Sequence, residues 1–256
     1  MNEPLIQRAA RDLLKSRKTI AFTGAGISVE SGIPDFRSAG GLWERFDPEE
    51  YAHIEAFYAH PEKVWQMLKE MFALVMQAKP NPAHLGLAEL ERMGLLSTVI
   101  TQNIDGLHQA AGNTQVIEFH GSHRTLTCLK CATTTDGTLL RVEDLPARCP
   151  RCASLLKPDV VFFGEPIPPK AQSASFRESR SCQLLLVIGT SAVVYPAASI
   201  PMIAKESGAT VIEVNMEPTP LTGRISDYLI MGPAGKIIPA IVEEVKRLSQ
   251  VERASG

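Results

Sequence analysis

The sequence lacks any long apolar stretch. No segment approaches the roughly 20 apolar residues that a membrane-spanning helix needs, and the longest apolar run, 184–189, has the length of a buried strand. Residues 1–18 lack the apolar core of a signal peptide and follow the pattern of an amphipathic helix. Neither sign of charge is in excess, since 26 Lys and Arg stand against 28 Asp and Glu, which favours neither a nucleic-acid nor a membrane partner. We therefore expect a cytoplasmic protein without direct nucleic-acid or membrane contacts.

Cysteine is also scarce, but four of the five cysteines form two pairs. Cys128 and Cys131 are separated by two residues, as are Cys149 and Cys152, and 17 residues lie between the pairs. Cytosolic thiols stay reduced, so such pairs indicate metal or redox chemistry rather than disulfides. Four thiolates at about 2.3 Å from one ion form a closed zinc site, which helps a segment poor in apolar residues to fold. We predict one structural zinc at these four residues; two redox pairs or an iron–sulfur cluster remain alternatives, and Cys182 fits a buried small hydrophobe.

The apolar pattern predicts an open α/β fold. Several short runs have Val, Ile or Leu at consecutive positions, which is typical of parallel strands buried on both faces. These predicted strands are 19–23, 98–101, 116–119, 184–189 and 210–214. Apolar residues at helical spacing predict helices at 61–77, 82–93, 197–207 and 235–248. The alternation indicates a doubly wound parallel sheet, interrupted by insertions at 35–78 and 121–157 that we expect to pack together as a smaller module.

A glycine-rich turn follows the first predicted strand. Gly24 and Gly26 would let the backbone approach a phosphate, which the following N–H groups can bind. The dinucleotide fingerprint G-x-G-x-x-G is not met, because Val29 occupies the place of the third glycine. This disfavours an ordinary dehydrogenase and leaves an ordinary tight turn as an alternative. Further along, Arg37 could pair with a phosphate and Phe36 could cover a flat ring, unless both lie in a solvated loop.

Polar side chains follow the predicted strands at the edge where ligands of open α/β sheets bind. They lie at 102–105, 120, 189–191 and 215 and offer amides, hydroxyls, a carboxylate and an imidazole. His120 is the best candidate base because imidazole titrates near neutral pH, although a single histidine after a strand is more often structural. Asp105 could equally cap a helix. This convergence predicts a nucleotide-binding and catalytic cleft.

Together these motifs resemble the sirtuins, in particular the compact bacterial and archaeal members of that family. The matching blocks occur in the family's order and are 24–37, 101–105, 118–121, the two cysteine pairs, 157–165, 189–191 and 214–215. The resemblance implies an α/β protein whose Rossmann-type NAD-binding domain consists of residues 1–34, 79–120 and 158–256. It implies a small domain made of a helical insertion, 35–78, and a zinc-ribbon-like insertion, 121–157.

The resemblance also implies an activity: an NAD-dependent protein-lysine deacetylase that yields nicotinamide, deacylated lysine and O-acetyl-ADP-ribose. The catalytic residues would be His120, as general base, with Asn103 and Asp105. The implied NAD contacts are Gly24, Ala25, Gly26, Phe36, Arg37, Gln102, Asn103, Ile104, Asp105, Gly189, Thr190, Ser191 and Asn215. The acyl-lysine peptide would pair as an added strand with Val161, Phe163 and Gly164. Phe163 and Ile104 would shield the reacting centre from water.

One departure from the family bears on specificity. Sirtuins that prefer succinyl or malonyl groups carry a Tyr and an Arg three residues apart in the helix of the small module, where this chain has Leu68 and Met71. Without that Arg, an acidic acyl group has no bidentate partner, and a desolvated carboxylate is costly. We expect a preference for acetyl and longer apolar acyl groups. The alternatives are a mono-ADP-ribosyltransferase that uses the same NAD site and a non-catalytic nucleotide-binding zinc protein.

Overall fold

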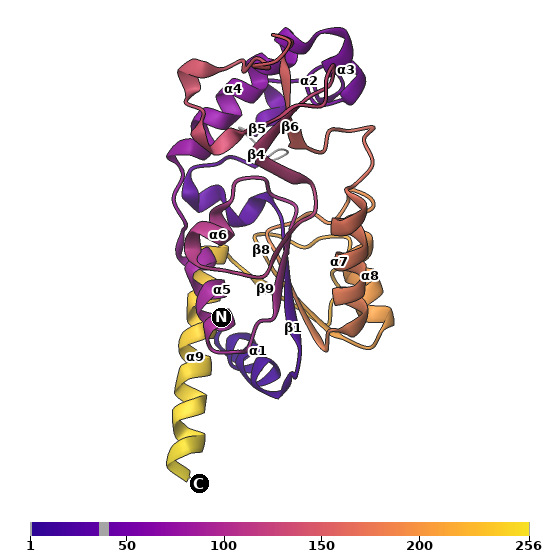
Figure 1. The fold of residues 1–256 in the computed structure, drawn as a ribbon. Helices are drawn as coiled ribbons and strands as arrows, with labels where there is room; N and C mark the ends of the chain where they lie inside the picture. Colours follow the sequence, from indigo (N-terminus) through magenta and orange to yellow (C-terminus); the bar gives the residue numbers. More distant parts are fainter. Residues whose placement is uncertain (1, 36–40, 256) are drawn as a thin grey trace.

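The computed structural model describes residues 2–35 and 41–255. Its larger part is a six-stranded parallel sheet with the order β3-β2-β1-β7-β8-β9, seen edge-on in Figure 1. The strands are β1 Thr19–Thr23, β2 Thr98–Thr101, β3 Val116–Glu118, β7 Leu184–Ile188, β8 Thr210–Asn215 and β9 Tyr228–Met231. The chain builds outward from β1 to β3 and then restarts at β7, beside β1, so the topological switch point lies between β1 and β7. The predicted doubly wound α/β fold is confirmed.

Helices cover both faces of this sheet (Figure 1). One face carries α1 Glu3–Lys15, α5 Pro82–Arg92 and α9 Ala234–Ser255, the other carries α7 Pro169–Ser181 and α8 Ser199–Glu206, and the short α6 Leu107–Ala111 follows β2. Ala21 of β1 packs in the core beneath α1, α5 and α9, whereas Ile20 and Phe22 pack in the core beneath α8. Because alternate side chains of a strand point to opposite faces, a strand covered on both sides is apolar throughout. In the described part of the chain, no helix has the length and apolarity that crossing a membrane requires.

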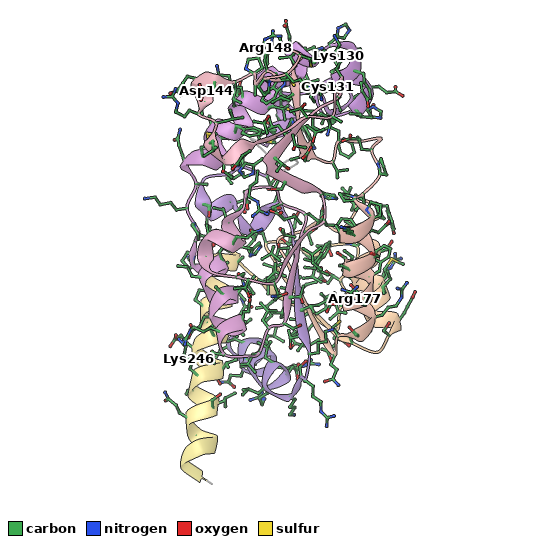
Figure 2. The ribbon with its side chains drawn as sticks, viewed as in Figure 1. Lys130, Cys131, Asp144, Arg148, Arg177 and Lys246 are labelled. Carbon is green, nitrogen blue, oxygen red and sulfur yellow. The ribbon has the colours of Figure 1, made fainter. Side chains whose placement is uncertain are left out.

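The smaller part combines the two predicted insertions. An antiparallel sheet has the order β5-β4-β6, and its strands are β4 Gly121–Cys128, β5 Thr134–Asp136 and β6 Leu156–Val160. The helices are α2 Pro48–Tyr51, α3 Ile54–Ala59 and α4 Pro61–Gln77. One apolar core joins Leu68 and Phe72 of α4 to Leu126 and Leu156 of the sheet. Figure 2 shows Cys131 and Arg148 at this end of the molecule, opposite Lys246 on α9. The predicted domain boundary at 157/158 falls inside β6, and the boundaries stay a prediction.

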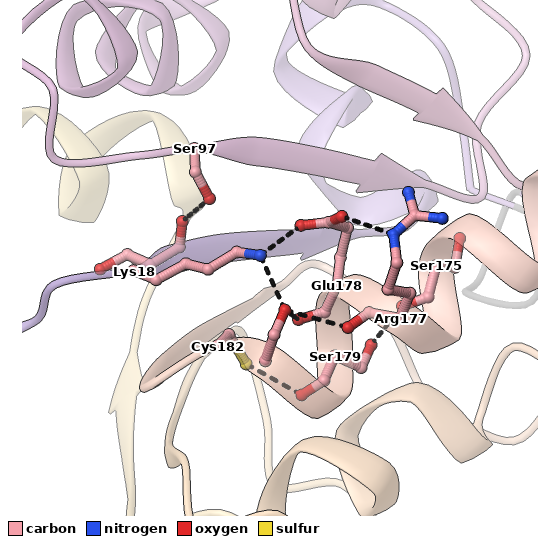
Figure 3. Close-up of polar contacts among 9 residues, drawn as sticks. Lys18, Ser97, Ser175, Arg177, Glu178, Ser179 and Cys182 are labelled. Atoms are coloured by element: carbon pink, nitrogen blue, oxygen red, sulfur yellow. Dashed lines mark hydrogen bonds and ion pairs between the residues drawn. The ribbon is translucent and has the colours of Figure 1, made fainter.

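Helix α7 was not predicted, because it buries small polar side chains in place of large apolar ones. Ser175 and Ser179 are fully buried, and the Ser179 hydroxyl donates to the backbone oxygen of Ser175 at 2.8 Å. Lys18, just before β1, holds the helix through an ion pair of 2.7 Å with Glu178 (Figure 3). Cys182 follows the helix and is buried as predicted; burial raises the pKa of its thiol to about 11, which disfavours the reactive thiolate.

Candidate active site

A cavity of about 520 Å³ lies between the carboxyl ends of the large sheet and the smaller module. Its lining includes every predicted catalytic, NAD-contacting or peptide-contacting residue that the structure describes. These are Gly24, Ala25, Gly26, Gln102, Asn103, Ile104, Asp105, His120, Val161, Phe163, Gly164, Gly189, Thr190, Ser191 and Asn215. The remaining two predicted contacts, Phe36 and Arg37, lie outside the described residues. One cavity therefore brings together motifs that are scattered over most of the sequence.

The glycine turns after β1 and β7 pack against each other at the topological switch point. The N–H of Gly26 donates to the carbonyl oxygen of Gly189 at 2.8 Å. A Cβ atom added to Gly26 would lie 2.8 Å from the Cα of Gly189, and one added to Gly24 would lie 2.7 Å from the Cβ of Thr190. Gly189 has φ +59, a conformation that favours glycine. The close approach of the two backbones therefore requires glycine at these positions. Without side chains, the turns line the cavity with peptide groups, which suit a phosphate.

The turn after β1 differs from the dinucleotide fingerprint in structure as well as in sequence. Two short 3₁₀ turns, Ala25–Ile27 and Val29–Ser31, follow Gly24 in place of a long helix. Gly32 ends the second turn with φ +87 and has open space around its Cβ position. Its role is therefore conformational. Val29, at the place of the third glycine of the fingerprint, is 45% exposed and is not in a close helix–strand contact.

A side-chain network joins the ends of β1 and β2. Asn103 donates through Nδ2 to the backbone oxygen of Gly24 at 3.1 Å and to the hydroxyl of Ser28 at 3.0 Å. The Ser28 hydroxyl donates to one oxygen of Asp105 at 2.6 Å, while the other oxygen of Asp105 accepts from the N–H of Leu107, the first residue of α6. Asp105 thus both lines the cavity and holds the start of a helix. Ser28 was not among the predicted site residues, although it belongs to the matching block 24–37.

Thr190 connects the ends of three strands. Its hydroxyl accepts from Nε2 of Gln102 at 2.9 Å and from the N–H of Ala192 at 3.1 Å. Its backbone oxygen accepts from Nδ2 of Asn215 at 3.2 Å. Gln102 follows β2, Thr190 follows β7, and Asn215 ends β8, so these contacts fix the polar rim of the cavity as one unit.

His120 has the geometry of a general base. Its Nδ1 atom lies 3.0 Å from the backbone oxygen of Gln102. Because a carbonyl oxygen only accepts, Nδ1 carries the hydrogen in the neutral ring and Nε2 has a free lone pair. Burial lowers the pKa of His120 below its ordinary 6.5, and the hydrogen bond to Gln102 opposes this in part. The ring is therefore neutral at pH 7 and able to accept a proton.

Two other histidines are buried away from the cavity lining. The ring centroids of His84 and His108 are 4.9 Å apart. His84 accepts at Nδ1 from the N–H of Asn81, and Nε2 of His108 lies 2.9 Å from the hydroxyl of Thr23. Burial lowers the pKa of His84 to about 4 and that of His108 to about 3. Both rings are neutral at pH 7 and belong to the core.

One part of the cavity is apolar. The α4 side chains that line it are Met67, Leu68, Met71, Leu74 and Val75. Leu68 and Met71, the positions expected from the sequence to bear on acyl specificity, are both buried. Among the described residues, no lysine or arginine lines the cavity. An acidic group that entered beside α4 would lose its water without gaining a cation.

The predicted peptide-contacting segment follows β6 and is held by both parts of the molecule. The N–H of Val161 donates to the backbone oxygen of His120 at 2.8 Å. Phe163 exchanges two backbone hydrogen bonds with the segment before α3: its N–H donates to the oxygen of Ala52 at 2.9 Å, and its oxygen accepts from the N–H of Ile54 at 3.0 Å. The Phe163 ring remains 40% exposed and lines the cavity, so it is available to a bound substrate.

Three further lining residues were missed from the sequence. Trp43 lies with its ring centroid 6.4 Å from that of Phe163. Val193 and Tyr195 line the cavity and are 46% and 67% exposed. The exposure of Val193 and Tyr195 is a property of the folded structure, so no sequence pattern singled them out.

The four paired cysteines form a site that fits one zinc ion. All four sulfurs lie within 4.8 Å of one another, with Cys128–Cys152 and Cys131–Cys149 separations of 3.5 Å. Four thiolates at about 2.3 Å from an ion in a tetrahedron would be roughly 3.8 Å apart. None of the four lines the cavity. A closed set of four sulfur ligands away from the cavity is a structural metal site, as predicted.

The two cysteine turns are built alike. The N–H of Ala132 donates to the oxygen of Cys128 at 2.8 Å, and the N–H of Ala153 donates to the oxygen of Cys149 at 2.9 Å. Both alanines have positive φ, +57 and +58. Each turn folds back four residues after its first cysteine, which directs both sulfurs of the pair to the same point.

Comparison with known proteins identifies the family. The chain matches the Sir2 family model over residues 24–196. It is 47% identical over 253 residues to the NAD-dependent protein deacylase of Pyrococcus furiosus, and the alignment covers 96% of this chain and 100% of that protein. It is 50% identical over 251 residues to the NAD-dependent protein deacylase 2 of Archaeoglobus fulgidus, covering 96% and 98%. A solved Sir2 homolog–NAD complex has a TM-score of 0.86 and 44% identity, covering 97% of this chain and 95% of that chain. The chain belongs to the Sir2 family, so the predicted resemblance to the sirtuins is confirmed.

Proposed function

We propose that this protein is an NAD-dependent protein-lysine deacylase that works mainly as a deacetylase. One observation carries the proposal: a single cavity holds the glycine turns, a neutral histidine with a free Nε2, and an apolar end beneath α4. The first suits the phosphates of NAD, the second suits proton abstraction, and the third suits the acyl group of a modified lysine. The names of the archaeal relatives, NAD-dependent protein deacylases, support the same activity.

NAD would bind along the switch point between β1 and β7. The close approach of Gly26 and Gly189 exposes backbone at the positions where pyrophosphate binds in related sheet architectures. Thr190, Gln102 and Asn215 form a prearranged polar rim beside it. NAD supplies the ADP-ribose acceptor of the acyl group and leaves as nicotinamide and the acylated ADP-ribose.

His120 would act on the ribose side of this reaction. In the neutral tautomer that Gln102 fixes, Nε2 accepts the proton of a ribose hydroxyl and so makes that oxygen a better nucleophile. Asn103 and Asp105, held together by Ser28, would orient the nicotinamide end. Ile104 and Phe163 line the cavity with apolar surface and would keep water from competing for the reactive carbon.

The acyl group would enter the apolar end. Leu68 and Met71 present hydrocarbon where a carboxylate would need a cation, so acetyl and longer apolar chains are favoured over succinyl or malonyl groups. A solved structure of a relative, Sir2Af2 bound to a myristoylated histone peptide, has a TM-score of 0.83 and 44% identity to this chain. That complex supports the acceptance of longer apolar groups. The protein partner would be an acyl-lysine protein without direct nucleic-acid or membrane contacts, and a cytoplasmic location stays a prediction.

The proposal is tested by product analysis. The purified protein is incubated with NAD and an acetyl-lysine peptide, and mass spectrometry follows the peptide and the nucleotide products. We expect deacetylated peptide and O-acetyl-ADP-ribose in equal amounts, with neither formed when NAD is omitted. Labelled ADP-ribose attached to protein without acyl loss would favour the mono-ADP-ribosyltransferase, and NAD binding without turnover would favour the non-catalytic alternative.

A further inference from the structure

A buried ion pair closes the segment that carries the peptide-contacting residues. Lys157 lies on β6 and Glu165 lies after Gly164, and Nζ of Lys157 is 2.9 Å from Oε2 of Glu165. The side chains are only 7% and 23% exposed. A buried ion pair contributes little stability beyond what a well-packed apolar pair would give. Stability alone is therefore a weak explanation for this pair, and its contacts with the backbone suggest a positioning role.

Both charged groups bind the backbone of the segment between them. Besides Glu165, the Lys157 ammonium donates to the oxygens of Val160, at 2.8 Å, and Pro158, at 3.2 Å, so all three of its hydrogens are used. It also lies 4.5 Å from the ring centroid of Phe162. The Glu165 carboxylate accepts from the N–H of Phe162 at 2.8 Å. The pair thus holds the start, the middle and the end of residues 158–165.

These contacts bear on how far each of two adjacent phenylalanines is exposed to the cavity, which both of them line. Phe162 is 6% exposed and packs against Phe57 of the small module, with ring centroids 5.7 Å apart. Phe163, the next residue, is 40% exposed and presents its ring to the cavity, whereas Phe162 reaches the lining with only a small part of its surface. A rotation of the segment would turn Phe163 and the backbone of Val161 away from the cavity together.

The segment is anchored to a rigid frame on the side of Lys157. Its neighbour Leu156 pairs with Cys128 across the sheet, and the Leu156 oxygen accepts from the indole N–H of Trp65 on α4 at 3.0 Å. The zinc-bearing sheet and α4 therefore fix the position from which Lys157 reaches toward Glu165.

We propose that Lys157 and Glu165 are positioning residues that set the affinity for the acyl-lysine peptide and leave NAD binding unchanged. The inference rests on the proposed deacylase function, because it assigns the 161–164 segment to the peptide. The polar rim and the glycine turns, which would bind NAD, are held by contacts among β1, β2, β7 and β8 and do not depend on this pair.

The test measures the effect of each variant on the peptide and on NAD separately. KM is measured for an acetyl-lysine peptide and for NAD, and the Kd of a fluorescein-labelled acetyl peptide is measured by anisotropy. In Lys157→Met, peptide KM and Kd should rise about tenfold, equal to ~1.4 kcal/mol of binding, with the KM for NAD within about twofold of the wild type. Lys157→Arg, which keeps the charge, should restore most of the peptide affinity. Lys63→Met is the matched control, because it removes an exposed lysine paired with Glu50 on the helical module.

Two results would contradict the positioning role of Lys157 and Glu165. Unchanged peptide KM in Lys157→Met, or equal rises in both KM values, would overturn the inference. If Lys157→Met fails to fold, Glu165→Gln takes its place, since it removes the charge but keeps the side-chain volume, and the same criteria apply. Wild-type protein that binds NAD but does not deacetylate would overturn the proposed function, and this inference with it, before any variant is compared.

Discussion

The Nδ1 atom of His120 lies 3.0 Å from the backbone oxygen of Gln102, and this contact fixes which ring nitrogen is free. We predict that His120→Ala lowers kcat by about 10²–10⁴-fold, the usual contribution of a positioned general base. The melting temperature and zinc content should stay close to those of the wild type, because His120 is outside the zinc site. His60→Ala, at the surface end of α4, is the control. Normal turnover in His120→Ala would refute the assignment of the base.

The zinc site predicts a loss of metal together with a loss of folded protein. Cys128→Ser removes one of four ligands from a site that holds together β4 and the segment before β6, so zinc content by atomic emission and the yield of soluble protein should both fall. Cys182→Ser changes a buried cysteine outside this site and should keep one zinc per chain. A stable, active and zinc-free Cys128→Ser protein would contradict the structural role.

The buried histidines predict a dependence of stability on pH. The folded pKa values of His84 and His108, about 4 and about 3, lie below the ordinary 6.5. Below pH 6.5 the unfolded chain therefore binds protons that the folded protein does not. The free energy of unfolding should fall as the pH decreases from about 6.5 to about 4. Each of the two histidines should contribute up to ~1.4 kcal/mol per pH unit. At higher pH these two groups should add no pH dependence.

Urea unfolding between pH 7.5 and 4.5 measures this effect. His84→Asn should lower the slope of the free energy of unfolding against pH. Other titrating groups cancel, because the variant is compared with the wild type at the same pH. Equal slopes in His84→Asn and the wild type would show that this imidazole is not the cause.

The contact between Gly26 and Gly189 predicts a specific loss of NAD binding. In Gly26→Ala the new Cβ would lie 2.8 Å from both the Cα and the oxygen of Gly189, so the two turns must separate. We expect the KM for NAD to rise about tenfold or more. Gly94→Asn is the control, since Gly94 also has positive φ but nothing lies near its Cβ position. A normal KM for NAD in Gly26→Ala would remove the glycine turn from the NAD site.

Much of the fold follows from local pattern. The strand at 19–23 and the helix at 61–77 match β1 and α4 residue for residue, because their burial leaves a clear apolar signature. Helix α7 was missed because serines occupy its buried positions, and β9 was missed because it is a short edge strand with mixed burial. The helix predicted at 235–248 begins one residue earlier in the structure and continues to Ser255.

The candidate site was predicted mainly from topology and from matching motifs. The carboxyl ends of parallel strands meet at one edge, so residues after β1, β2, β7 and β8 were expected together and line one cavity. Val193 and Trp43 could not be found in this way, because their place depends on how a loop and the small module pack across the cavity. The bond from Ser28 to Asp105 likewise joins residues that are distant in sequence and that no local pattern pairs.

The most direct test measures NAD-dependent release of nicotinamide with three peptides that differ only in the lysine: acetylated, succinylated and unmodified. The cavity has apolar side chains at Leu68 and Met71 and no lysine or arginine among its described lining residues. We therefore predict rapid release of nicotinamide with the acetyl peptide and little release with the other two. Faster release with the succinyl peptide would contradict the specificity, and no NAD-dependent release with any of the three would contradict the proposed deacetylase activity itself.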